Sequence, residues 1–234
     1  MKWWLLAKGA GINVSIGRAM KASFIGMYAN CFGLGTLGAD IARGILLTGN
    51  ASERPASFAT VVADRFLGMA VLASIGVVSV FVFSISTIGQ GLIYVALGVC
   101  LLIPVGWVLG PRCVLFLIKG SPRMTAKLGG ILKAFPTNPV LMLSVCLIAL
   151  VFHLFQIGLF AAIASGMGAP IPWTYLLVSI PFANLVSNLP LSWMGLGIRE
   201  NVYVFFFVPA YLNTEQAVAF GAIWLLAMTI ASAT

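Results

Sequence analysis

Two charged residues, Arg199 and Glu200, stand side by side in one of the most apolar stretches of a chain that is 61% hydrophobic. A charge at bilayer depth costs about 2.5 to 3.5 kcal/mol, so such residues usually face a partner or a wet cavity on a substrate path. A guanidinium offers paired donors that suit a phosphate group, and it stays charged at any relevant pH. We therefore interpret Arg199 as a candidate phosphate clamp. The alternative is a structural ion pair with Glu200 or Asp40.

A second polar site with the same layout lies earlier in the chain. Each site has an asparagine, then a stretch that carries glycines, then an acid and a base as near neighbours. The asparagines could coordinate a head group or cap broken helices, and the acid and base of the first site could simply neutralise each other on one helical face. Because lone charges at depth seek partners, we expect the two sites to meet in one cavity. The candidate substrate-binding residues are Asn30, Asp40, Arg43, Asn188, Gly195, Gly197, Arg199 and Glu200.

The composition is typical of a membrane protein that crosses the bilayer several times. Charged residues make up 8% of the 234 residues, and the mean hydropathy is +1.09, which excludes a soluble domain. The net charge of +8 comes from bases in short loops beside apolar runs, where they orient the chain and contact anionic lipid. Nucleic-acid binding is therefore excluded. The four cysteines are scattered, so we expect no metal site, and we expect no cofactor.

Apolar runs of helical length define the expected spans. A helix that begins near Ser52 carries Asp64 and Arg65 before its long apolar run. Two further elements, 22–47 and 173–210, are apolar but interrupted by glycines and prolines, among them Pro181, and we interpret them as broken or re-entrant. The expected apolar spans are 66–86, 92–109, 140–165 and 215–232.

The order of these elements predicts an inverted repeat. Three crossings separate the two interrupted elements, so they would enter the membrane from opposite sides, as in many secondary transporters. Residues 110–136 carry five bases and no acid, which places this loop in the cytoplasm of a protein of the cell membrane. Residues 1–21 predict a basic amphipathic segment at the membrane surface. The fold class is all-α: a polytopic transmembrane bundle with two oppositely oriented broken elements, in one integral-membrane domain over residues 1–234.

For three other polar residues, the sequence favours a structural role over a functional one. Asp64 and Arg65 are expected at the membrane interface, where an adjacent acid and base mostly serve the structure. His153 stands alone on a long apolar span. It could take part in a proton relay, but no acid lies within a helical turn or two of it, so a hydrogen-bonded packing role is favoured.

The two polar sites resemble the motifs of the lysylphosphatidylglycerol synthase transmembrane-region family, also called flippase-like membrane proteins. The resemblance spans most of residues 20–233. Asn30, Asp40 and Arg43 match the family's first motif. Trp193 and Met194 stand where the family tends to have Pro-Gly, and the first motif lacks its usual proline. The match to the second motif is carried by Asn188, Pro190, Gly195, Gly197, Arg199 and Glu200.

This resemblance implies translocation of a lipid head group between the membrane leaflets. The lipid would be an anionic phospholipid or a polyprenyl-phosphate-linked sugar, and a synthase or glycosyltransferase could be a partner. Family members usually begin with about two further spans and continue past the last helix, so the resemblance also implies a chain that is truncated at both ends. The identity of the lipid, the energy source and the oligomeric state stay open at this point.

Two other functions compete with translocation. The chain could be a membrane-embedded glycosyl or aminoacyl transferase that uses its acids as bases. Against this, catalysis needs a nucleophile, a metal site or a tuned acid and base grouped together, and the sequence displays ion-pair chemistry instead. The chain could also anchor a soluble lipid-modifying synthase. We expect no enzymatic activity and no catalytic residue.

Overall fold

The computed structural model describes residues 1–29, 35–48, 51–83, 90–118, 138–187 and 197–233. Within these ranges the regular secondary structure is entirely helical, which confirms the all-α class. A short 3-10 turn, η2 (Ala51–Glu53), precedes the fourth helix. The helices are α1 (Lys2–Gly9), α2 (Ile16–Ala29), α3 (Gly35–Leu47), α4 (Arg54–Phe83), α5 (Gln90–Ile118), α7 (Pro139–Gly166), α8 (Trp173–Ser187), α9 (Ile198–Phe207) and α10 (Thr214–Ala233).

Three helices of the described part are long and apolar enough to cross a membrane: α4, α7 and Thr214–Ala231 of α10. Two shorter apolar stretches, Ile93–Trp107 inside α5 and the whole of α8, accompany them. These helices cover the expected spans. Asn138 caps α7 by accepting hydrogen bonds from the N–H groups of Val140 and Leu141, which explains why that span begins where it does.

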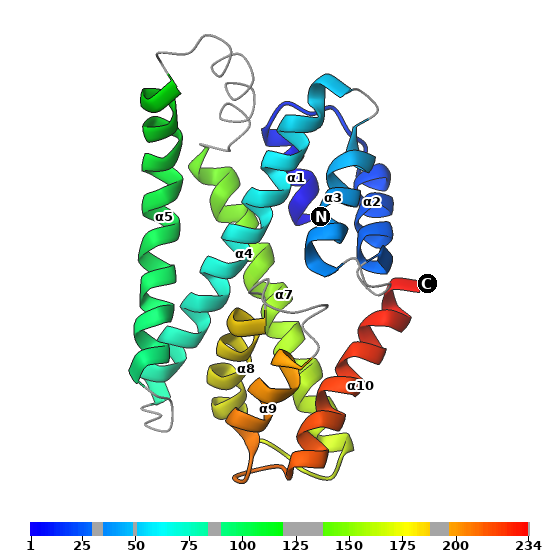
Figure 1. Cartoon of the computed structure of the whole chain (residues 1–234), viewed down its shortest axis with the longest axis vertical. Helices are drawn as coiled ribbons and strands as arrows, with labels where there is room; N and C mark the ends of the chain where they lie inside the picture. Colours follow the sequence, from blue (N-terminus) through cyan, green and yellow to red (C-terminus); the bar gives the residue numbers. More distant parts are fainter. Residues whose placement is uncertain (30–34, 49–50, 84–89, 119–137, 188–196, 234) are drawn as a thin grey trace.

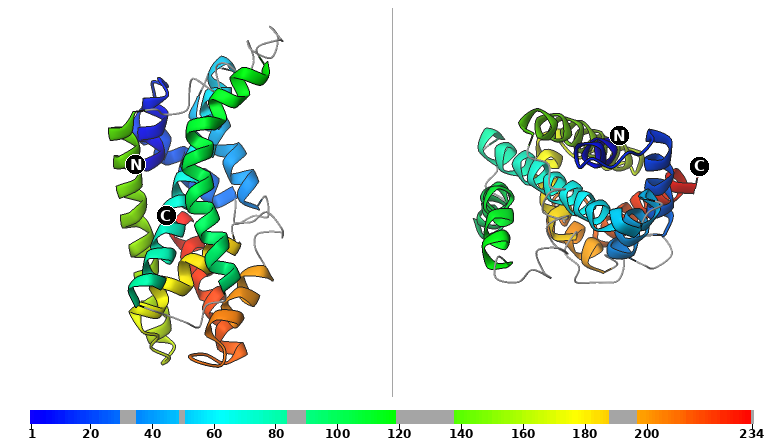
Figure 2. Two further views of the ribbon diagram at one scale, coloured as in Figure 1. Left: turned by 90° about the vertical axis from the view of Figure 1, so that its left-hand side faces the viewer. Right: turned by 90° about the horizontal axis from the view of Figure 1, so that it is seen from above.

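Helix α4 is the centre of the bundle. It packs against α1, α3 and η2 near its start and against α5, α7 and α8 further along (Figure 1). Figure 2 shows α5 standing on the outer side of α4. The largest hydrophobic core joins α4 and α7 to α8, α9 and α10, and its fully buried side chains include Phe160, Phe182, Tyr203 and Phe220. The long helix α4 therefore connects this core to the N-terminal helices.

Pro181 does not interrupt the chain as predicted, because it lies inside α8 and is buried there. A proline removes one helical N–H, but neighbouring helices and hydroxyl side chains can satisfy the freed backbone groups in membrane proteins. Ser179 Oγ donates to the carbonyl of Tyr175 at 2.8 Å in the same helix. The change from α8 to α9 falls after Ser187, and Pro190 lies outside the described residues.

Each interrupted element contains two helices that pack against each other, α2 with α3 and α8 with α9. In Figure 1 the α2–α3 pair lies beside α1 in the upper half of the molecule, and the α8–α9 pair lies in the lower half. Within each pair the two helices run in opposite directions (Figure 1). The two polar motifs are thus carried by two helical hairpins at different levels of the bundle.

The N-terminal segment, expected at the membrane surface, is packed against other helices of the protein. Helix α1 packs between α4 and α7, and Trp3, Leu6 and Ala7 are buried there. Leu6 joins a small hydrophobic cluster with Ala63, Leu67 and Val145. The segment is therefore part of the bundle, and its first basic residue, Lys2, points to a partner inside the protein.

Candidate functional site

Five charged side chains from three helices form one network, which we call the charged cluster: Lys2, Asp40, Arg43, Asp64 and Arg65. Arg43 bridges the two acids, with Nη1 at 3.7 Å from Asp40 Oδ1 and Nη2 at 3.3 Å from Asp64 Oδ2. Lys2 Nζ lies 3.2 Å from Asp64 Oδ1, and Arg65 Nε donates to Asp40 Oδ2. Three cations and two carboxylates leave the cluster with one net positive charge.

The side chain of Arg43 is held in place by its neighbours on α1 and α2. A Cβ atom added to Gly26 would lie only 2.6 Å from Arg43 Cγ, so the absence of a side chain at this position of α2 makes room for the arginine. The guanidinium carbon lies 4.5 Å from the ring centroid of Trp3, a cation–π contact. The indole N–H of Trp3 donates to Thr60 Oγ1 at 3.1 Å. These contacts orient the guanidinium toward the cluster.

A cavity of about 220 Å³ opens beside this cluster, and we call it the charged cavity. Ligand pockets for drug-sized molecules begin at about 300 Å³, so this space suits a small polar head group with its water. The Nε atom of Arg43 is buried and has no hydrogen-bond partner among the described residues. A buried donor without a partner costs free energy, and an entering oxygen acceptor would satisfy it. The cavity is lined by Lys2, Arg43, Asp64, Arg65, Gly68, Met69, Leu72, Phe152 and His153.

His153 joins α7 to α4 at the wall of the charged cavity. Its Nε2 lies 3.2 Å from the carbonyl oxygen of Gly68, and its Nδ1 lies 3.3 Å from Gln156 Oε1. The expectation of a hydrogen-bonded histidine is therefore confirmed. The structure adds that this residue also faces the cavity that holds the charged cluster.

A second, apolar space lies between α4 and α7 and overlaps the charged cavity along part of both helices. This apolar groove has a volume of about 550 Å³, in the range of ligand pockets. Val71 and Ile75 from α4, Leu150 and Leu154 from α7, and Leu177 from α8 line it, together with Ala70, Ser74, Val78, Ser79, Cys146 and Leu147. On α4 the charged cavity is lined from residues 64–72 and the groove from residues 70–79, and on α7 the cavity residues 152–153 lie within the groove's range of 146–154. A polar site and an apolar site therefore lie on neighbouring faces of the same two helices.

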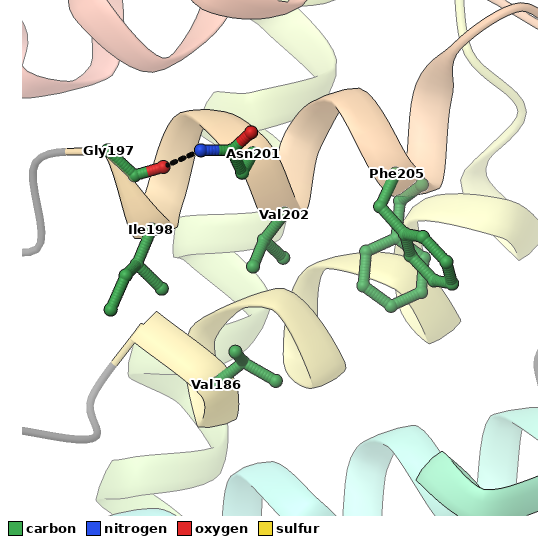
Figure 3. Close-up of a pocket in the computed structure, with 7 residues that line it drawn as sticks. Val186, Gly197, Ile198, Asn201, Val202 and Phe205 are labelled. Atoms are coloured by element: carbon green, nitrogen blue, oxygen red, sulfur yellow. Dashed lines mark hydrogen bonds between the residues drawn. The ribbon is translucent and has the colours of Figure 1, made fainter. Parts of the chain in front are cut away.

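The second polar motif begins α9. Gly197 has φ +83°, a conformation that favours glycine, and precedes the first helical residue, Ile198. Its N–H donates to Glu200 Oε2 at 2.6 Å, so the glutamate caps its own helix. Figure 3 shows Asn201 donating to the Gly197 carbonyl at the rim of a pocket of about 370 Å³ between α8 and α9. Val186, Val202 and Phe205 supply apolar lining to this pocket (Figure 3).

Arg199 lies half-buried in the first turn of α9. In the described part of the chain it has no ion pair with Glu200 or Asp40 within 4.0 Å, so the alternative of a structural pair has no support there. No ion pair of the described residues joins the two motifs either. Their predicted meeting in one cavity stays a prediction.

The expected pairing of Asp40 with Arg43 on one helical face is confirmed. Asn30, Asn188 and Gly195 lie outside the described residues. In the structure, Asp64 and Arg65 belong to the same network as Asp40 and Arg43. The sequence position of Asp64 and Arg65 had suggested a separate pair at the membrane interface. It also adds Lys2, whose partner is 62 residues away. The depth of Asp64 and Arg65 in an apolar helix was a signal that could have placed them with the first motif.

Comparison with known proteins agrees with this architecture. The family model described as the lysylphosphatidylglycerol synthase TM region matches residues 1–233. The chain belongs to this family. It is therefore a membrane protein of a family connected with lipid modification or translocation, which is consistent with membrane lipid as its substrate. No curated protein and no solved structure matches the chain.

Proposed function

We propose that this protein of the lysylphosphatidylglycerol synthase TM family moves an anionic lipid between membrane leaflets. The observation that carries the proposal is the charged cavity with its net positive charge and its unpartnered Arg43 Nε, next to the apolar groove. A phosphate-bearing head group matches the first space, and an acyl or polyprenyl chain matches the second. An amphiphile with a negative head is the ligand that uses both.

In this proposal the cations of the charged cluster hold the phosphate. Arg43 and Arg65 offer planar, multiple donors, and Lys2 adds a mobile ammonium. Asp40 and Asp64 keep these cations apart and oriented, so a head group has to compete with carboxylates for them. Binding that is strong enough to admit the lipid but weak enough to release it suits transport.

In this proposal the second motif serves the other half of the path that the lipid head group takes across the membrane. Arg199 at the start of α9 adds a guanidinium beside a helix N-terminus, where backbone N–H groups favour anions. The two hairpins, α2–α3 and α8–α9, run antiparallel within themselves and lie in different halves of the bundle, which supports the proposed inverted repeat (Figure 1). The proposal also places the basic segment 110–136 in the cytoplasm of a cell-membrane protein, although its residues 110–118 are the last turns of α5 and not a loop as expected.

Two alternatives predict different products in the same assay. A transferase would form a new lipid species, and an anchor subunit would be inactive until a soluble synthase is added. Translocation requires neither a new lipid species nor an added synthase. The three functions can therefore be separated by assaying the purified protein first alone and then with a soluble synthase.

The test is reconstitution into liposomes that carry fluorescent phosphatidylglycerol in both leaflets. A membrane-impermeant reductant bleaches only the outer label, so translocation makes the inner label accessible while empty liposomes stay protected. Mass spectrometry of the lipids checks for a new covalent product. Transport without a partner supports the proposal; a new lipid product, or inactivity until a synthase is present, contradicts it.

Arg43→Lys tests the role of the charged cavity. Lysine keeps the charge but loses the fork of donors, and loss of a charge-assisted hydrogen bond of about 1.5 to 3 kcal/mol predicts a transport rate lower by about tenfold or more. Arg18→Lys is the matched control, because Arg18 is exposed on α2 and lies outside the cluster. Equal rates for the two variants would remove the charged cavity from the transport path.

A further inference from the structure

His153 is the single histidine of the chain, and it lies where a proton could change the charge of the head-group cavity. Its imidazole faces the cavity from α7. The charged groups that line the cavity with it are Lys2 of α1, Arg43 of α3, and Asp64 and Arg65 of α4. Of the helices packed on α7, α8 and α10 contribute no residue to the described lining.

The hydrogen bonds of His153 fit both protonation states. Nε2 faces the Gly68 carbonyl, which only accepts, so the neutral ring carries its proton on Nε2. Nδ1 faces Gln156, whose amide can offer its N–H₂ to a neutral ring or its oxygen to a charged ring. A proton added from water at Nδ1 therefore finds an acceptor in Gln156 Oε1, which already lies 3.3 Å from this nitrogen.

The charge balance of the cavity determines how readily His153 takes up this proton. Without a ligand, the charged cluster has one positive charge in excess, and a second positive charge on the imidazole is opposed. A phosphodiester brings one negative charge and removes that opposition. The head group and the proton then favour each other's binding, and this coupling is reciprocal by thermodynamic necessity.

We propose that His153 binds a proton when the charged cavity binds the phosphate-bearing head group. This inference rests on the proposed function, and it adds an energy source: a proton taken up with the lipid on one side of the membrane and released with it on the other. Histidine suits the role because its ordinary titration lies between pH 5 and 8. The ligand class of the site is thus a phosphodiester anion plus one proton.

Because His153 is the single histidine, its ring signals can be followed directly by NMR in purified, isotopically labelled protein. The probe is phosphatidylglycerol with two six-carbon chains, and the control is the corresponding diacylglycerol, which has the same chains but no phosphate. Saturation with the probe should raise the proton affinity of His153 about tenfold, within the usual range of couplings between sites. The control lipid should leave it unchanged.

Binding of the same probe should tighten by the same factor, about tenfold, between pH 8 and pH 5. His153→Gln should lose this dependence, because glutamine can still donate to Gly68 but cannot take up a proton in this range. Gln156→Leu keeps the imidazole and removes the acceptor for the added N–H. It should therefore lower the proton affinity of His153 and move the pH dependence of probe binding to lower pH by the same amount, and this second effect is one that a purely structural histidine would not display.

Two results would overturn the inference in distinguishable ways. If the probe binds with Arg43-dependent affinity but the titration of His153 does not move, the head-group site stands and the proton site fails. If the probe does not bind at any pH, the proposed head-group site fails as well. A pH dependence of binding that survives in His153→Gln would assign the proton to another group.

Discussion

The contact between Gly26 and Arg43 gives the most direct test of how the charged cluster is positioned. We expect Gly26→Ala to destabilise the protein and to weaken transport together. The added Cβ would lie 2.6 Å from Arg43 Cγ and 3.0 Å from the backbone oxygen of Ala39. The arginine cannot move away freely, because Trp3 and two carboxylates hold its guanidinium. Helices α2 and α3 must therefore separate slightly.

The magnitude follows from two opposing effects. Overpacking by one methyl group in a tight contact costs about 1 to 3 kcal/mol. Alanine also favours the helix over glycine by about 1 kcal/mol or less, which hides part of this cost. Gly17→Ala is the matched control, since Gly17 lies in the same helix and a Cβ there would meet nothing within 4 Å. The difference between the two variants isolates the steric term at about 1 to 3 kcal/mol.

The assay is thermal unfolding of both purified variants in the same detergent, beside the liposome transport assay. For a chain of this size, about 2 to 4 °C accompany each kcal/mol, so the Tm of Gly26→Ala should lie about 2 to 12 °C below that of Gly17→Ala. Transport should fall with Gly26→Ala and hold with Gly17→Ala. Equal Tm values with equal transport would refute the close packing of α2 on Arg43 and the positioning role derived from it.

Three further predictions use other parts of the molecule. Tyr203→Phe should raise the free energy of unfolding by about 1 kcal/mol in chemical or thermal denaturation, because its buried hydroxyl has no hydrogen-bond partner in the part of the chain that the structure describes; a loss of stability would reveal one. Arg199→Lys should lower liposome transport with stability intact, since it loses the paired donors; restoration of transport by neutralising both Arg199 and Glu200 would instead make the arginine a counter-ion. In intact cells, a cysteine at Lys127 should resist a membrane-impermeant thiol reagent and one at Ala169 should react; the reverse pattern would overturn the orientation.

Local sequence signals predicted the helices well. Apolar runs of helical length located the spans of α4, α7 and α10, and the glycines and prolines located two elements that each contain a pair of helices. Pro181 was misjudged as a break, because intrinsic propensity ignores the packing that stabilises α8 in a buried position. The packing of helix α1 was likewise not predicted: its bases indicated a segment at the membrane surface, which stays a prediction, while Trp3 and Leu6 are buried in the bundle.

The site was predicted only in part. The pairing of Asp40 with Arg43 is predicted by their spacing of three residues, which puts them on one helical face in any α-helix. Their further partners cannot be predicted from spacing, since the ion pairs of Arg43 with Asp64 and of Arg65 with Asp40 join α3 to α4 across a helix contact. Such pairs depend on the crossing of two helices, and no local period encodes that crossing.

The sequence by itself determined that this chain is an all-helical membrane protein of a lipid-handling family with charges in its apolar interior. Composition and periodicity suffice for the membrane class, because burial of polar groups in lipid is costly wherever it occurs, whereas the family was indicated by the resemblance of the two polar motifs. The tertiary structure decided which charges meet: it brought Lys2 of α1 to Asp64 of α4 and set His153 of α7 at the same cavity. Packing between distant helices fixes these neighbours, and packing is a property of the whole chain rather than of any segment.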